Sequence, residues 1–238
     1  MSNPKLLLCD TGPLIQVFLT KEFLPKLLPL RLLRDRYGVQ AVVVDEVENE
    51  ISYHSTFLTQ FEGDLKKAIH GGLIRKLDDS TIIATGVQEQ NVGAVKAQLQ
   101  FVGKTNHRYV DKGEAYTFAA AVTLGQVALS DDRNAVKILH AKGRPLPNTI
   151  LRFFDLVAFC RQVGELGDGQ CDKIRQKLLE WEEYVFEFRN KSFEAGITTY
   201  ALRIQDEALT RIGGPGDPAC LPCEKVRLLR RLGTTQNI

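Results

Sequence analysis

The sequence has few of the features that would place a chain outside the ordinary globular proteins. Its 238 residues include one Trp, one Met and four His. No stretch approaches the roughly 18 uncharged apolar residues that a membrane span requires. The five Cys are an odd number, and the apolar run that begins at Leu6 is far too short for an export signal. We therefore expect no disulfide framework, no membrane association and a cytoplasmic protein with reduced thiols.

A strong excess of charge of one sign is also missing. The chain has 31 Lys and Arg against 29 Asp and Glu, which gives a formal net charge of +2. So small an excess argues neither for nor against a polyanionic partner, and any basic binding surface must be local. With 44% hydrophobic and 25% charged residues, the composition is typical of a globular protein.

Short apolar runs alternate with helical patterns along the first two thirds of the chain. Strands are predicted at residues 6–9, 41–44, 73–77 and 126–129. Such short continuous runs are typical of strands buried on both faces. Apolar residues recur at helical spacing between them, and helices are predicted at residues 23–32, 47–57, 115–124 and 134–142. This alternation predicts an α/β fold, with a parallel sheet flanked by helices.

A glycine-rich stretch at residues 164–170 divides the chain. We interpret residues 1–163 as one domain and residues 171–238 as a C-terminal helical extension. Apolar residues at spacings of three or four mark its first helix, namely Ile174, Leu178, Trp181, Val185 and Phe188. A basic helix is predicted at residues 224–232.

Carboxylates lie where the predicted strands end. Asp10 follows the first apolar run, and Asp131 and Asp132 follow the apolar run at residues 126–129. Glu50 and Glu114 lie in predicted helical segments. In a parallel sheet all of them approach one edge, where ligands bind in such folds. Several carboxylates so close together repel one another unless a cation binds them. Mg²⁺ and Mn²⁺ prefer oxygen ligands and can activate water toward a phosphodiester, so we hypothesise metal-assisted phosphodiester hydrolysis.

Four segments that carry these acids resemble, in order and spacing, the PIN-domain nucleases. They are residues 8–15 (LCDTGPLI), 44–51 (VDEVENEI), 111–115 (DKGEA) and 129–133 (LSDDR). The resemblance covers roughly residues 4–163. It implies a PIN-like parallel sheet, an acidic pocket and an endoribonuclease that depends on Mg²⁺ or Mn²⁺.

The resemblance also implies a role for individual residues. The catalytic acids and metal ligands would be Asp10, Glu50, Glu114 and Asp132, with Asp131 as an additional ligand and Thr11 and Ser130 as orienting hydroxyls. The family often has Pro before its second helix, where this chain has Asp45. That departure leaves Glu46 and Glu48 as rivals to Glu50.

Each acid also has an ordinary structural explanation. Asp111 and Glu114 have the spacing of a capping box, and so have Asp45 and Glu48. For Asp45 and Glu48 we favour capping, and Asp132 alone would also suit an N-cap. The joint occurrence of four acids in one ordered set favours the metal site.

A pocket of carboxylates would repel RNA unless positive charge lies nearby. The candidate substrate contacts are Lys104, Arg108 and Arg133, and single-stranded or looped RNA is the expected substrate. Relatives in this family include toxins held inactive by a small antitoxin protein, and we expect a homo-oligomer. The alternatives are a nucleic-acid or protein-binding module with little catalysis, and a DNA-cleaving nuclease. Cys220 and Cys223 form only half of a zinc site, and we favour incidental thiols there.

Overall fold

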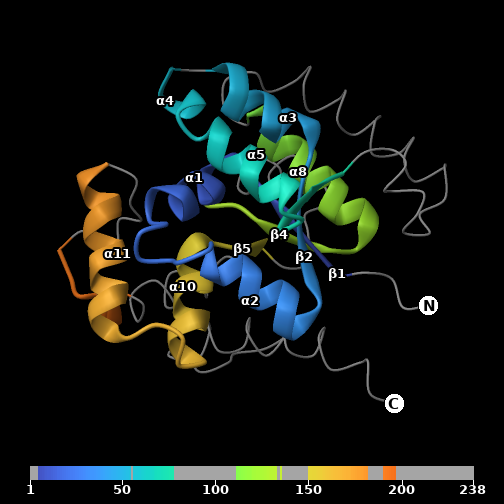
Figure 1. Ribbon diagram of the computed structural model, residues 1–238. Helices are drawn as coiled ribbons and strands as arrows, with labels where there is room; N and C mark the ends of the chain where they lie inside the picture. The colour runs from blue at the N-terminus through green and yellow to red at the C-terminus, as the bar shows by residue number, and fades with distance from the viewer. Residues whose placement is uncertain are drawn as a thin grey trace, which may run out of the picture.

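The fold is α/β with a sheet of parallel strands. The computed structural model describes the chain at residues 5–54, 56–77, 111–132, 135, 150–181 and 190–196. Within these ranges five strands form one sheet in the order β3-β2-β1-β4-β5 (Figure 1). The strands are β1 (Lys5–Cys9), β2 (Val39–Val43), β3 (Ile74–Lys76), β4 (Val127–Leu129) and β5 (Ile150–Leu151). All neighbouring pairs are parallel, which confirms the predicted α/β class.

The central strand β1 explains why the sequence reads as unbroken apolar runs. Leu7 is in register with Ala41 of β2 on one side and with Val127 of β4 on the other. Leu7, Leu8 and Cys9 are fully buried because helices cover both faces of the sheet. Alternation of polar and apolar residues is therefore absent, and all four predicted strands are found.

Helices form most of the described connections between the strands. In chain order they are α1 (Thr11–Leu19), α2 (Leu28–Tyr37), α3 (Asp45–Asn49), the π-helical turn η1 (Glu50–His54), α4 (Thr56–Thr59), α5 (Glu62–His70), α8 (Lys112–Leu124), α10 (Phe153–Gln162) and α11 (Asp168–Glu180). The alanine-rich helix predicted at residues 115–124 is α8, which ends at the left-handed Gly125.

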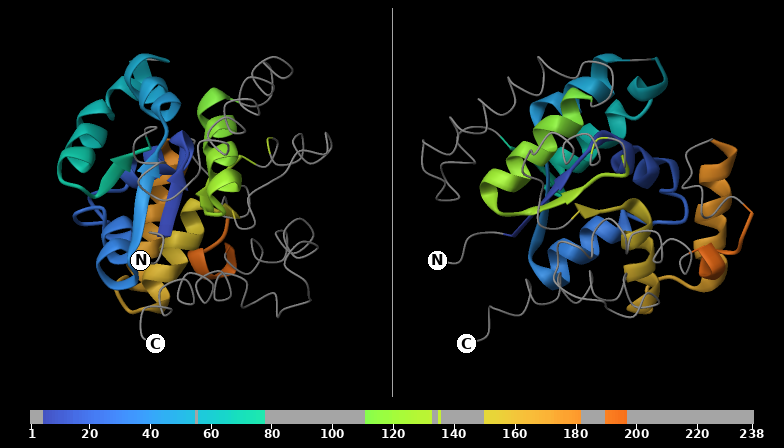
Figure 2. Two further views of the ribbon diagram at one scale, coloured as in Figure 1. Left: turned by 90° about the vertical axis from the view of Figure 1, so that its right-hand side faces the viewer. Right: turned by 180° about the vertical axis from the view of Figure 1, so that it is seen from behind.

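Strands are added to the sheet in opposite directions on the two sides of β1. β2 and then β3 follow on one side, whereas β4 and β5 lie on the other. Figure 2 shows α8 on one side of the sheet, with α2 and α5 on the opposite side. The strand order therefore reverses between β1 and β4, which is the point where open α/β sheets bind ligands.

One predicted helix begins later than the apolar spacing indicated. The pattern at residues 23–32 predicted a single helix, but Phe23 lies in the turn between α1 and α2. Lys26 and Leu27 adopt left-handed backbone angles, with φ of 55° and 51°. Such angles are incompatible with a continuous helix. The helix starts only at Leu28, with a proline in its first turn.

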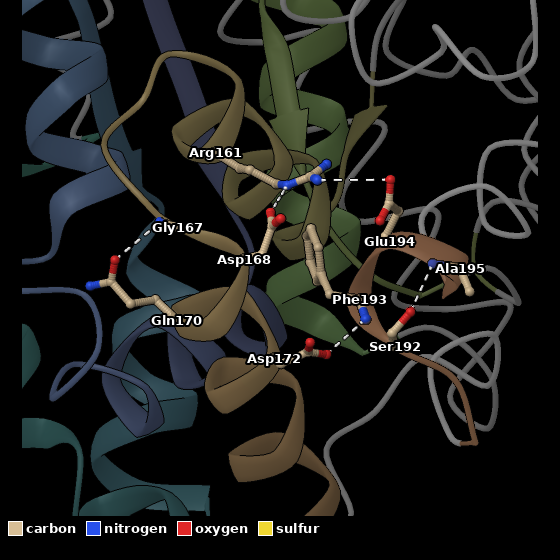
Figure 3. A network of polar contacts seen from close by, with 9 residues as sticks. All are labelled: Arg161, Gly167, Asp168, Gln170, Asp172, Ser192, Phe193, Glu194 and Ala195. Atoms are coloured by element: carbon tan, nitrogen blue, oxygen red, sulfur yellow. Dashed lines mark hydrogen bonds and ion pairs between the residues drawn. The ribbon is translucent and has the colours of Figure 1, made fainter.

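The first helix of the predicted extension packs on the rest of the fold. α11 contacts both α1 and α10. Arg161 of α10 pairs with Asp168 of α11 at 2.5 Å and with Glu194 at 4.0 Å (Figure 3). The buried Phe193 donates its backbone N–H to Asp172 at 2.8 Å (Figure 3). Residues on both sides of the glycine-rich stretch thus share one hydrophobic core.

Parts of the predicted organisation concern residues outside the described ranges. These are most of the helix at residues 134–142, Val185, Phe188, the basic helix at residues 224–232, Cys220 and Cys223. In the described part of the apolar stripe, Ile174 and Leu178 are buried. Trp181 follows the end of α11 and is 39% exposed. Among the described helices, none has the length and apolarity needed to cross a bilayer.

Candidate functional site

A cavity of about 250 Å³ opens at the carboxyl edge of the sheet, where the strand order reverses. Its lining consists of Asp10, Thr11, Gly12, Glu50, Leu58, Asp111, Glu114 and Asp132. The four acids predicted as catalytic are thus brought together from four separate segments of the chain. Because the strands are parallel, the segments that follow β1, β2 and β4 all reach this edge.

Asp10 connects the end of β1 to the start of α1. Its backbone N–H donates to the Leu129 carbonyl at 2.9 Å, which continues the pairing of β1 with β4. Its Oδ1 accepts the backbone N–H of Thr11 at 2.8 Å, so Asp10 is the N-cap of α1. The side chain is nearly buried, at 7% exposure. The positive end of the α1 dipole stabilises a carboxylate in this place.

The hydroxyl of Ser130 lies between two of the acids. Ser130 Oγ is 3.0 Å from Asp10 Oδ2 and 2.8 Å from Glu114 Oε1, and it accepts the Asp132 N–H at 3.3 Å. A hydroxyl has one proton and can donate to only one of the two carboxyl groups. The arrangement is satisfied when Ser130 donates to Asp10 and a protonated Glu114 donates to Ser130. Without a cation, this geometry therefore favours one proton shared by the pair.

Burial acts on the acids in the same direction. Removal from water, together with the nearby charges of Glu50 and Asp131, raises the pKa of Asp10 to about 7. Burial and the charges of Asp10 and Asp132 raise the pKa of Glu114 to about 10. Both carboxylates are thus costly to ionise in the metal-free protein. A bound cation would remove that cost.

Glu50 is held by two donors from different parts of the chain. The Thr11 hydroxyl donates to its Oε2 at 2.5 Å, and the Gly113 backbone N–H donates to its Oε1 at 2.7 Å. A Cβ atom on Gly113 would lie 2.5–2.9 Å from the carboxylate atoms of Glu50. Only glycine therefore allows α8 to approach Glu50 this closely.

The rivals of Glu50 are placed elsewhere. Glu48 forms an ion pair with Lys76 of β3. Glu46 is partly buried, and burial raises its pKa. Neither of the two is among the described residues that line the cavity. The geometry thus separates Glu50 from its sequence neighbours.

The two acids after β4 differ in their positions. Asp132 lines the cavity, and its Oδ1 accepts the Ala135 N–H at 3.1 Å. This bond has the form of an N-cap. The capping interpretation and the site interpretation are therefore compatible for Asp132. Asp131 is not part of the described lining, although its charge contributes to the raised pKa of Asp10.

The capping prediction for Asp45 and Glu48 is wrong. α3 begins at Asp45 itself, its N-cap is Val44, and no side chain caps it. Asp111 does occupy the N-cap position of α8, but its side chain makes no capping hydrogen bond and lines the cavity. Asp111 and Gly113 are therefore site residues that the sequence interpretation missed. Their signal was adjacency to Glu114 in the segment DKGEA.

The donor set of the cavity suits a hard divalent cation. Five carboxyl groups line it, and oxygen donors of this type are preferred by Mg²⁺ and Mn²⁺. Among the described residues, no three acids, His or Cys already stand together as a ready-made metal-binding group. The carboxylate oxygens of Glu50 and Asp10 instead accept hydrogen bonds from Thr11, Gly113 and Ser130. By its chemistry the donor set fits such an ion.

The predicted substrate contacts Lys104, Arg108 and Arg133 lie outside the described residues.

Comparison with protein-family models, curated proteins and solved structures gives no match for this chain.

Proposed function

We propose that the protein is a metal-dependent endoribonuclease of the PIN type, which hydrolyses phosphodiester bonds at the acidic cavity. One observation carries the proposal: Asp10, Glu50, Glu114 and Asp132 line a single cavity where the strand order reverses. Acids with a purely structural role would not be expected to cluster in one cavity, because their mutual repulsion destabilises the fold.

These four acids would hold Mg²⁺ or Mn²⁺. When bound, such an ion would polarise the scissile phosphate and provide the nucleophile from water. The other polar groups of the cavity position the acids. Thr11 and Gly113 fix Glu50, and Ser130 fixes Asp10 and Glu114. Ionisation of Glu114 in the loaded site would release a proton to solvent.

Cleavage of a labelled single-stranded RNA tests the proposal. The assay compares wild type with Asp10→Asn in Mg²⁺, in Mn²⁺ and in EDTA. Asp10→Asn should lower the rate at least about hundredfold, because the amide carries no charge for the cation. Asp35→Asn is the matched control, since Asp35 is a half-exposed acid on α2 that pairs with Arg34. It should leave the rate unchanged.

The same assay separates the alternatives. Preferential cleavage of a DNA strand of the same sequence would assign a DNA nuclease instead. Binding of RNA without cleavage, in either metal, would assign a binding module. Full activity of purified Asp10→Asn would refute the catalytic site.

A further inference from the structure

Asp111 differs from the other four acids of the cavity lining. Among the described residues, no hydrogen-bond donor or ion-pair partner contacts its carboxylate. Each of the other four carboxyl groups is hydrogen-bonded to a backbone N–H or to a hydroxyl. Asp111 is also exposed, whereas Asp10 and Glu114 are buried. The protein therefore compensates the charge of Asp111 least.

The position of Asp111 is one where an Asp side chain ordinarily caps a helix. It is the N-cap residue of α8, with an extended backbone, but its side chain does not cap that helix. An N-cap Asp usually accepts the backbone N–H of the residue two or three positions further on. In α8 the residue two positions on is Gly113, whose N–H donates to Glu50 Oε1 at 2.7 Å. Glu50 therefore caps α8 in place of Asp111.

The packing of two helices explains this replacement. α3 contacts α8 and leads directly into η1, which begins at Glu50 (Figure 1). Gly113 has no side chain to keep the Glu50 carboxylate away from its N–H. The positive end of the α8 dipole also favours a carboxylate there. Because a distant acid fills the capping role, the Asp111 carboxylate is left to line the cavity.

We propose that Asp111 binds the divalent cation as a fifth carboxylate, from the exposed side of the cavity. This inference rests on the proposed metal-dependent function. An N-cap Asp that does not cap forgoes a stabilising hydrogen bond, and its charge adds to the repulsion among the other acids. A bound cation turns that repulsion into attraction. Mg²⁺ keeps several of its waters when it binds to proteins, and an exposed carboxylate is well placed to contact such a hydrated ion.

Mn²⁺ binding measured by isothermal titration calorimetry, without RNA, tests the contact. Asp111→Asn removes the charge but keeps the size of the side chain and a residue that suits an N-cap. It should weaken Mn²⁺ binding about tenfold. Asp45→Asn is the matched control, because Asp45 is an exposed acid at the start of α3 and is not among the described residues of the lining. It should bind Mn²⁺ as wild type does.

Thermal unfolding separates cation binding from a role in holding α8. In EDTA, Asp111→Asn should unfold at the wild-type temperature or above it, because the change relieves repulsion and removes no cap. Added Mn²⁺ should raise its unfolding temperature less than that of wild type. A lower unfolding temperature in EDTA, together with unchanged Mn²⁺ affinity, would assign Asp111 a structural role and overturn the inference.

RNA cleavage distinguishes failure of this contact from failure of the proposed function. For Asp111→Asn the Mn²⁺ concentration that gives half the maximal rate should rise about tenfold, while the rate at saturating Mn²⁺ stays within about threefold of wild type. If wild type binds Mn²⁺ and cleaves RNA but Asp111→Asn has the same Mn²⁺ affinity, the contact fails and the ribonuclease function stands. If Asp111→Asn weakens Mn²⁺ binding but wild type does not cleave RNA, the contact stands and the ribonuclease function fails. If wild type binds no Mn²⁺, both proposals fail.

Discussion

The backbone N–H of Gly113 donates to Glu50 Oε1 at 2.7 Å, across 63 positions of sequence. This bond joins the first turn of α8 to η1, two elements that are far apart in the sequence. Together with the Thr11 hydroxyl on Oε2, it leaves the Glu50 carboxylate little freedom to turn. Catalytic carboxylates need such restraint, because small displacements of a catalytic group are costly.

Gly113→Ala should therefore displace Glu50. The added methyl group would meet the carboxylate at 2.5–2.9 Å, and overpacking of this kind costs about 1–3 kcal/mol. RNA cleavage should fall at least about tenfold, and thermal unfolding should shift to lower temperature. Gly63→Ala in α5 is the control, because a Cβ there has no neighbour within 4 Å. Equal activity of the two variants would contradict the tight approach of α8 to Glu50.

The choice between Glu50 and Glu48 can be tested directly. Glu50→Gln should abolish metal-dependent cleavage, since Glu50 lines the cavity. Glu48→Gln should change stability by less than about 1 kcal/mol and leave cleavage intact, because it removes only a partly exposed ion pair with Lys76. Rates measured for both variants at saturating Mn²⁺ decide the matter. Loss of activity in Glu48→Gln alone would reverse the assignment.

The Thr11 hydroxyl can be removed without changing the shape of the side chain. Thr11→Val should lower kcat about tenfold, because Glu50 Oε2 loses its 2.5 Å donor. Thr11→Ser keeps the donor and should retain most of the activity. If Thr11→Val and Thr11→Ser have the same kcat, the hydroxyl has no orienting role.

Stability of the metal-free protein should fall as pH rises. Burial raises the pKa of Asp10 from 3.8 to about 7 and that of Glu114 from 4.5 to about 10. Between the unfolded and folded values the folded state binds more protons, so its free energy of unfolding decreases with pH. For Asp10 this loss is complete above about pH 7, whereas for Glu114 it continues toward pH 10.

Thermal unfolding in EDTA at about pH 6 and about pH 9 measures this loss. Each pKa unit corresponds to about 1.4 kcal/mol, so a difference of a few kcal/mol is expected. Glu114→Gln removes the larger contribution and should flatten the dependence. A pH slope that is the same in wild type and Glu114→Gln would contradict the buried position of this acid.

Much of the fold could be predicted from the sequence because burial leaves a clear pattern. β1 and β2 are buried on both faces, and each ends just before the segment that carries a site acid. The convergence of Asp10 and Asp132 on one cavity follows from parallel strands, because each acid comes just after a strand of the sheet. β5 could not be predicted in the same way, since its two residues, Ile150 and Leu151, are too few to show a period.

Errors arose where tertiary contacts override local signals. Asp45 looked like an N-cap, yet the helix starts at Asp45 because Val44 is still extended at the end of β2. Gly113 stands beside Glu114 in the sequence, but its close approach to Glu50 depends on packing between distant elements and could not be predicted. Asp111 was interpreted as a helix cap, whereas its side chain lines the cavity.

The most direct test of the account is Mn²⁺ binding followed by electron paramagnetic resonance. We predict that the wild-type signal of free Mn²⁺ is quenched by stoichiometric binding. Asp10→Asn and Glu114→Gln should each weaken that binding at least about tenfold, while Asp35→Asn leaves it unchanged. Failure of the wild type to bind Mn²⁺, or equal binding by all four proteins, would contradict a metal site in the acidic cavity.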